Sequence, residues 1–173
     1  IHLLPTLFAE IDAHSPGTKL SFSEWNYGGG DDISGAIAPA DVLGIFGEQG
    51  VFAATFFPLH GAEPFNHAGL RVYRNFDGAG GSFGATSVRA STSDVARVSV
   101  YASDDPIVVV AINKTSSPIM AGLTIAAPET THLRAFVLDG SGAAIHAADG
   151  FDAVDTNAFA VTLPASSIVV LAP

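Results

Sequence analysis

The first half of the chain alternates between helical and strand-like spacing of its hydrophobic residues. Leu4, Leu7, Phe8 and Ile11 recur at the spacing of one helix face. Strands are predicted where apolar residues alternate or run together, at "KLSFSE" (19–24) and "VFAATFF" (51–57). The uninterrupted second run is expected for a strand that is covered on both faces. Further helices are predicted at "ADVLGIFGE" (40–48), with Pro39 in the first turn and Gly50 just past the end, and at "FNHAGLRVYRNF" (65–76).

This order of helix, strand, helix, strand, helix predicts βαβ units and a parallel sheet. Two such units cannot close a (β/α) barrel, which takes about 250 residues. The chain also begins at Ile1 without Met or a basic leader segment. We therefore expect a piece of a longer protein, with the end of an α/β domain over residues 1–84.

The second half follows a different pattern. Short strand-like runs are separated by turn clusters such as "SDDP", "TSSP", "DGSG" and "ADGF". Seven such runs favour an antiparallel β-sandwich over residues 85–173. The runs are "TSVRAS", "RVSVYAS", "IVVVAIN", "IMAGLTIA", "HLRAFVL", "AFAVTL" and "SIVVLA". The expected fold class is thus α+β, with two βα units followed by a sandwich.

Composition narrows the possible functions. The chain is 48% hydrophobic and 14% charged, so it can bury a core. Acidic residues outnumber basic ones 17 to 7, which argues against nucleic acid and anionic membranes as partners. No apolar run reaches the roughly 18 residues of a membrane span. The absence of cysteine excludes thiolate catalysis and cysteine-ligated metal sites.

Candidate chemistry gathers in "SEWNYGGGDD", residues 23–32. Glu24 comes where a strand is predicted to end, and catalytic groups of α/β barrels lie at that rim. Trp25 and Tyr27 offer apolar faces on which sugar rings stack, and the glycines let the backbone approach a bulky substrate. Glycoside hydrolysis needs two carboxyl groups beside the bond that is cut, and Glu24 would fit as one of them. A solvated loop glutamate is the alternative from residue type alone, and the glycine run lacks the order of a nucleotide-binding loop.

Two long segments, 21–57 ("SFSEWNYGGG" through "VFAATFF") and 70–91 ("LRVYRNFDGAGGSFGATSVRAS"), resemble glycoside hydrolase family 44. The resemblance implies a retaining endo-β-1,4-glucanase or xyloglucanase, secreted by a bacterium, with a TIM-like barrel and a β-sandwich. It places Glu24 on the family's nucleophile and the general acid on an earlier barrel strand, outside this chain. The partners it implies are β-glucan or xyloglucan and the remainder of the barrel, without cofactor or metal. The chain alone is expected to be inactive.

The candidate substrate-binding residues lie at the same predicted rim: Trp25, Asn26, Tyr27, Phe57 and His60. Phe56 and Phe57 stand where the family more often has Leu-Trp, which would alter stacking. Glu63 also follows the second strand, and capping of the next helix is the alternative for this residue and His60.

A different class of function stays open, in which the sandwich is a carbohydrate-binding or structural module. Its single tyrosine, Tyr101, and its lack of tryptophan make this alternative weaker. Calcium binding at "DGFDAVD" (149–155) is disfavoured, because the oxygens do not follow the spacing of an EF-hand loop.

Overall fold

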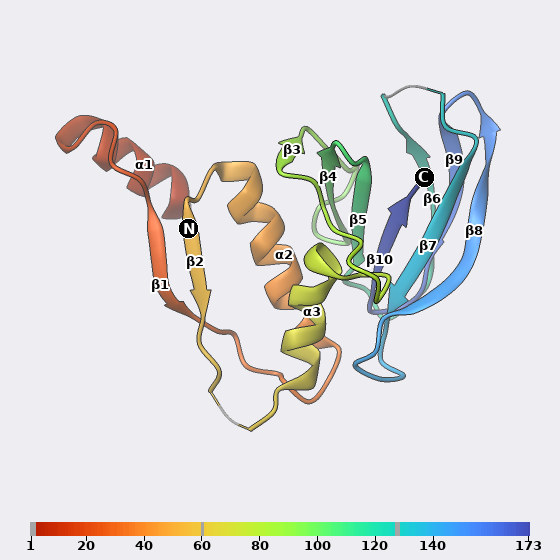
Figure 1. Ribbon diagram of the computed structural model, residues 1–173, viewed down its shortest axis with the longest axis horizontal. Coiled ribbons are helices and arrows are strands. Elements are labelled where there is room, and N and C mark those ends of the chain that lie inside the picture. Colours follow the sequence, from red (N-terminus) through yellow and green to blue (C-terminus); the bar gives the residue numbers. More distant parts are fainter. Residues whose placement is uncertain (1–2, 60, 127–128) are drawn as a thin grey trace.

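The computed structural model describes residues 3–59, 61–126 and 129–173 (Figure 1). Within these ranges, three helices and two strands come first, and eight strands follow. The elements are α1 (Leu3–His14), β1 (Ser21–Trp25), α2 (Ser34–Gln49), β2 (Ala53–Phe56), α3 (Pro64–Arg74), β3 (Thr86–Val88), β4 (Val98–Asp104), β5 (Val108–Asn113), β6 (Ile119–Thr124), β7 (His132–Leu138), β8 (His146–Asp155), β9 (Ala158–Leu163) and β10 (Ser167–Ala172). No helix among the described residues has the length and apolarity that crossing a membrane would need.

The first half confirms the predicted order and the parallel pairing. β1 pairs with β2 in parallel, and α2 connects them. The prediction that residues 51–57 are covered on both faces is wrong for this structure, since Ala53 and Thr55 are exposed. Helices pack on one face of the two-stranded sheet, and the alternate residues of β2 point to the other.

Helix α2 begins at Ser34, six residues earlier than predicted, so Pro39 lies inside the helix rather than in its first turn. The early start is stabilised by Asp32, whose Oδ1 accepts the Ser34 N–H at 2.8 Å. The end of the helix is as predicted. Gly50 adopts a left-handed conformation with φ 75° and donates its N–H to the last turn.

The second half forms one curled eight-stranded sheet in the order β3-β4-β5-β10-β7-β8-β9-β6, with every pair antiparallel. The antiparallel prediction is confirmed, but β8 was missed, and the "ADGF" predicted as a turn lies inside it. Glycine and aspartates with few β-branched residues give β8 a weak strand signal. Its strand form comes from pairing with β7 on one side and β9 on the other.

Two apolar clusters hold the molecule together. One joins the inner faces of α2 and α3 to one face of the sheet, with Ala36, Val72, Val110, Ile168 and Val170 almost completely buried. The other lies on the opposite face of β5 and β10, where the curled sheet covers itself with β9 and β6. β5 and β10 are buried along their whole lengths because each contributes to both clusters.

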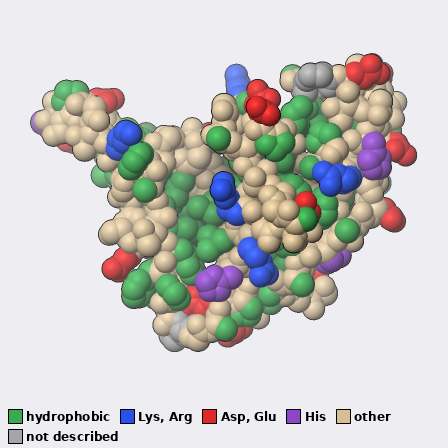
Figure 2. Space-filling view, in the orientation of Figure 1, with side chains coloured by type: hydrophobic (Ala, Val, Ile, Leu, Met, Phe, Trp, Pro, Cys, Tyr) green, Lys and Arg blue, Asp and Glu red, His purple; other side chains and the backbone are tan. Residues whose placement is uncertain are grey.

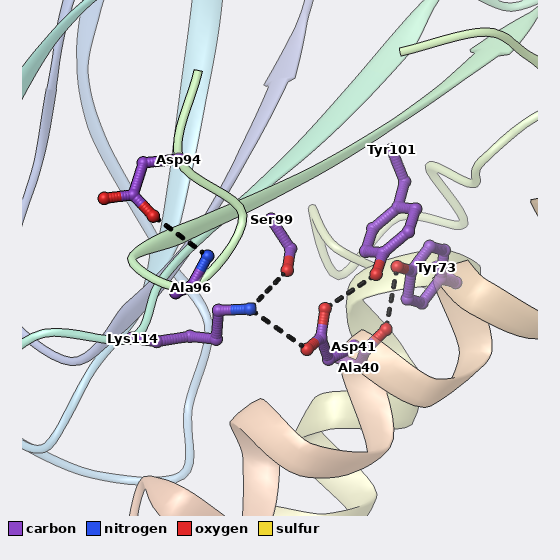
Figure 3. Close-up of polar contacts among 8 residues, drawn as sticks. All are labelled: Ala40, Asp41, Tyr73, Asp94, Ala96, Ser99, Tyr101 and Lys114. Carbon is purple, nitrogen blue, oxygen red and sulfur yellow. Dashed lines mark hydrogen bonds and ion pairs between the residues drawn. The ribbon is translucent and has the colours of Figure 1, made fainter. Parts of the chain in front are cut away.

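Polar contacts join α2 to the sheet beside the first cluster (Figure 3). The Tyr101 hydroxyl donates to Asp41 Oδ1 at 2.6 Å, and Lys114 Nζ lies 3.5 Å from Asp41 Oδ2 and 2.8 Å from Ser99 Oγ. The Tyr73 hydroxyl of α3 donates to the Ala40 carbonyl at 2.9 Å. Burial raises the pKa of both tyrosines well above its ordinary value, and the nearby Asp41 carboxylate acts in the same direction.

Candidate active site

Glu24 lies near the carboxyl end of β1, as predicted, and its side chain is exposed. The ladder between β1 and β2 is irregular here: Phe22 pairs with Ala54, yet Trp25 pairs with Phe56, so three steps on β1 match two on β2. Residues three apart face opposite sides of a regular strand. Here Phe22 stacks on Phe46 of α2 at 4.9 Å, and Trp25 meets the same ring edge-on at 5.8 Å. Such an irregularity can redirect a side chain at a functional site, and Glu24 lies inside it.

Two aromatic side chains are exposed near Glu24. Tyr27 is 64% exposed in the loop after β1, and Phe57 is 49% exposed directly after β2. The ends of the two strands are bonded, since the Phe57 N–H donates to the Trp25 carbonyl at 3.0 Å. Figure 2 shows hydrophobic side chains gathered over this lower end of β1 and β2, with acidic atoms beside them. An exposed carboxylate therefore lies at a rim that also carries exposed aromatic rings.

Trp25 is largely buried, and its ring also meets the exposed Tyr27 ring, at 6.3 Å. It is 9% exposed and packs edge-on against Phe56 at 5.4 Å as well as against Phe46. Its Nε1 is buried without a hydrogen-bond partner among the described residues. In this structure Trp25 supports the aromatic layer behind Glu24, and its direct contact with substrate stays a prediction.

Asn26 connects the two strand ends through its side-chain amide. Its Nδ2 donates to the Phe57 carbonyl at 2.8 Å and to Glu63 Oε2 at 3.0 Å. Its Oδ1 accepts the Gly28 N–H at 2.7 Å. The side chain thus fixes the backbone on both sides of the rim, and a contact between Asn26 and substrate stays a prediction. His60, the remaining candidate, lies outside the described residues.

Glu63 is the rim residue whose role sequence reasoning missed. It lies at the start of α3, is 6% exposed, and accepts the Leu59 N–H on Oε1 at 2.7 Å. Its Oε2 accepts the side-chain amides of Asn26 and Asn66, the latter at 2.8 Å. Glu63 occupies the N-cap position of α3, as the helix-capping alternative predicted, but its side chain makes no capping hydrogen bond to the helix N-terminus. Leu59 and Asn66 lie within four residues of Glu63, but Asn26 comes from a separate loop 37 residues earlier, and that contact leaves no local sequence pattern.

Comparison with known proteins finds relatives over nearly the whole chain, although no family model matches it. The chain is 37% identical over 169 residues to endoglucanase A of Paenibacillus lautus, covering 94% of this chain and 24% of that protein. The chain therefore spans about a quarter of this curated relative.

Solved structures also match over nearly the whole chain. A glycoside hydrolase family 44 xyloglucanase of Paenibacillus polymyxa matches with a TM-score of 0.94 and 33% identity, over 98% of this chain and 34% of that one. A family 44 endoglucanase of Clostridium thermocellum matches with a TM-score of 0.93 and 36% identity, again over 98% and 34%. The Paenibacillus polymyxa enzyme has also been solved with xyloglucan.

Proposed function

Since this chain is a partial chain of a glycoside hydrolase family 44 enzyme, we propose that it carries the catalytic nucleophile of a retaining endo-β-1,4-glucanase or xyloglucanase. The observation that carries the proposal is the exposed Glu24 carboxylate near the carboxyl end of β1, in a segment whose fold matches these enzymes. In this proposal β1 and β2 are strands of a TIM-like barrel, and the curled sheet is the family's β-sandwich. The division between residues 84 and 85 is part of the same proposal.

The mechanism begins with attack of a Glu24 carboxylate oxygen on the anomeric carbon. The bond to the leaving sugar breaks as a general acid protonates the glycosidic oxygen, and a covalent glycosyl-enzyme forms. The group that acted as general acid, a second carboxyl group, then deprotonates a water molecule. This water breaks the bond between Glu24 and the sugar and releases the sugar with its original configuration. Tyr27 and Phe57 are suitably exposed to stack on the glucan chain.

The second carboxyl group is proposed to lie outside this chain. Glu63 is the other rim glutamate among the described residues, and its carboxylate is buried and accepts three N–H groups. Because its oxygens accept these hydrogen bonds inside the protein, the Glu63 carboxyl group is not placed to protonate a leaving group. We accordingly expect the 173-residue chain alone to release no reducing sugar from β-glucan or xyloglucan.

The function of the whole enzyme is tested by replacing Glu24 in the complete protein. Glu24→Gln should lower turnover of xyloglucan by about a thousandfold or more while leaving the circular dichroism spectrum unchanged. Glu10→Gln, on the exposed face of α1, is the matched control and should keep full turnover. Near-normal turnover of the Glu24→Gln variant would refute the assignment.

A nucleophile is distinguished from a general acid by chemical rescue. Glu24→Gly leaves space in which azide can attack the anomeric carbon of an activated aryl cellobioside. The expected product is the α-glycosyl azide, opposite in configuration to the β-linked substrate. A β-glycosyl azide would instead assign Glu24 the role of acid.

The alternative of a sugar-binding sheet is not favoured by the structure. Tyr101, the tyrosine of the second half, is 8% exposed and covered by α2. The large exposed hydrophobic residues of the described sheet region are aliphatic, namely Val88, Val95, Met120 and Val154. We propose an extracellular location, because polymeric glucans are too large to enter a cell.

A further inference from the structure

We propose that Glu63 is a positioning residue that holds the two strand ends of the active site in register. The proposal rests on the function assigned to Glu24 above. Glu63 does not itself touch the reacting atoms. Its buried carboxylate joins the loop after β1, the loop after β2 and the first turn of α3.

Hydrogen bonds reach the Glu63 carboxylate from each of these three segments. Asn26 lies two residues beyond Glu24, Leu59 lies two residues beyond Phe57, and Asn66 belongs to α3. Burying an ionised carboxylate is costly unless several donors compensate it, and hydrogen bonds to a charged acceptor are the stronger kind. Glu63 therefore fixes its donors more firmly than a neutral side chain of the same shape.

Packing around Glu63 reinforces the same connection. A Cβ on Gly30 would lie 2.8 Å from the Glu63 Cβ and Cγ, so the loop after β1 rests directly on this side chain. The Phe65 N–H donates to the Gly30 carbonyl at 3.0 Å beside it. The loop that follows Glu24 is thus fixed to the start of α3 by both packing and hydrogen bonds.

The backbone of Glu63 is itself strained. It has φ 42° and ψ 55°, in the left-handed region that non-glycine residues seldom occupy. Such conformations persist where the surroundings determine them, and they are concentrated at functional sites. The rate of a reaction between two groups in an active site falls steeply when one of them is displaced by about 1 Å. Loosening Glu63 should therefore slow the attack by Glu24 without unfolding the protein.

The test uses Glu63→Gln in the complete protein and a probe for the nucleophile alone. An activated 2-deoxy-2-fluoro-β-cellobioside traps the glycosyl-enzyme, so its inactivation rate reports how well Glu24 attacks. In either orientation the glutamine NH2 faces a donor, because the Leu59 N–H occupies one side and the Asn26 and Asn66 amides occupy the other, and Asn26 cannot turn since its Oδ1 accepts the Gly28 N–H. We expect the rate to fall about tenfold or more at a temperature where the variant is fully folded. Glu10→Gln should stay within twofold of the wild type.

A purely structural role would give a different result. The melting temperature of Glu63→Gln would fall, but inactivation well below that temperature would keep the wild-type rate, and the inference would be overturned. If Glu63→Gln does not fold, Asn66→Ala removes one of the donors named above and should slow inactivation several-fold. An unchanged rate would overturn the inference. Labelling of the wild type at a residue other than Glu24 would refute the proposed function instead.

Discussion

The ring of Tyr101 lies directly over the backbone of Gly44, so closely that a Cβ on Gly44 would collide with it. Gly44 is in α2 and Tyr101 is in β4, so this contact sets how near the helix approaches the sheet. α2 also packs behind β1 through Phe46, which contacts both residues flanking the Ser23–Glu24 pair. The helix therefore connects the sheet to the strand that carries the candidate nucleophile.

Gly44→Ala should lower the free energy of unfolding by about 1–3 kcal/mol, because the added methyl group forces the helix and the Tyr101 ring apart. Gly47→Ala is the matched control. It lies one turn further along α2 with nothing within 4 Å of an added Cβ, so it should raise stability by about 0.5–1 kcal/mol. Urea unfolding of both variants provides the comparison. Equal effects of the two changes would contradict the close packing of Gly44.

Tyr101→Phe should destabilise the protein by about 1–2 kcal/mol, because it removes the hydroxyl that donates to the Asp41 carboxylate. Tyr27→Phe, at an exposed position, should change stability by less than about 0.5 kcal/mol. A double-mutant cycle with Asp41→Ala, which removes the acceptor, should show coupling between Tyr101 and Asp41, measured by urea unfolding. Additive effects would mean that the 2.6 Å contact contributes nothing to stability.

Phe57→Ala in the complete enzyme should raise the KM for xyloglucan several-fold, because the half-exposed ring is proposed to stack on the glucan chain. Phe52 is the matched control. It is similarly exposed just before β2, at the opposite end from Glu24, and it lies under the Lys19 ammonium at 4.2 Å. Phe52→Ala should leave KM unchanged. A KM that responds to Phe52→Ala but not to Phe57→Ala would place the sugar-binding rim at the other end of the strand.

Asp77 should contribute to stability in a pH-dependent way. Hydrogen bonds from the Ala79 and Gly81 N–H groups, at 2.8 and 2.7 Å, lower its pKa below the ordinary value. A lowered pKa in the folded state means that the stabilisation is present above about pH 4 and is lost as pH falls through the folded pKa. The melting-temperature difference between the wild type and Asp77→Asn should therefore shrink between about pH 4 and pH 2. A difference that stays constant over this range would contradict the prediction.

Local sequence patterns predicted the features that depend on local chemistry. Gly50 ends α2 because a left-handed residue is needed there, and Glu24 follows apolar alternation that ends at a strand terminus. β8 was missed because its strand form depends on two neighbouring strands and not on its own residues. The role of Glu63 was missed for the same reason, since Asn26 reaches it from the loop after β1, 37 residues earlier in the chain. Features that depend on contacts between distant segments could not be predicted from the local sequence pattern.

The apolar cluster shared by α2, α3 and the sheet has a consequence for protein engineering. A chimera that exchanges the sheet with a homologue at residue 85 would place one protein's helices on another protein's strands. Val72 and Ala36 would then pack against strand residues from the other protein. Both residues are buried, and buried side chains tolerate changes in the volume of their neighbours poorly. Chimeras of such enzymes should therefore take α2, α3 and the sheet from the same parent protein.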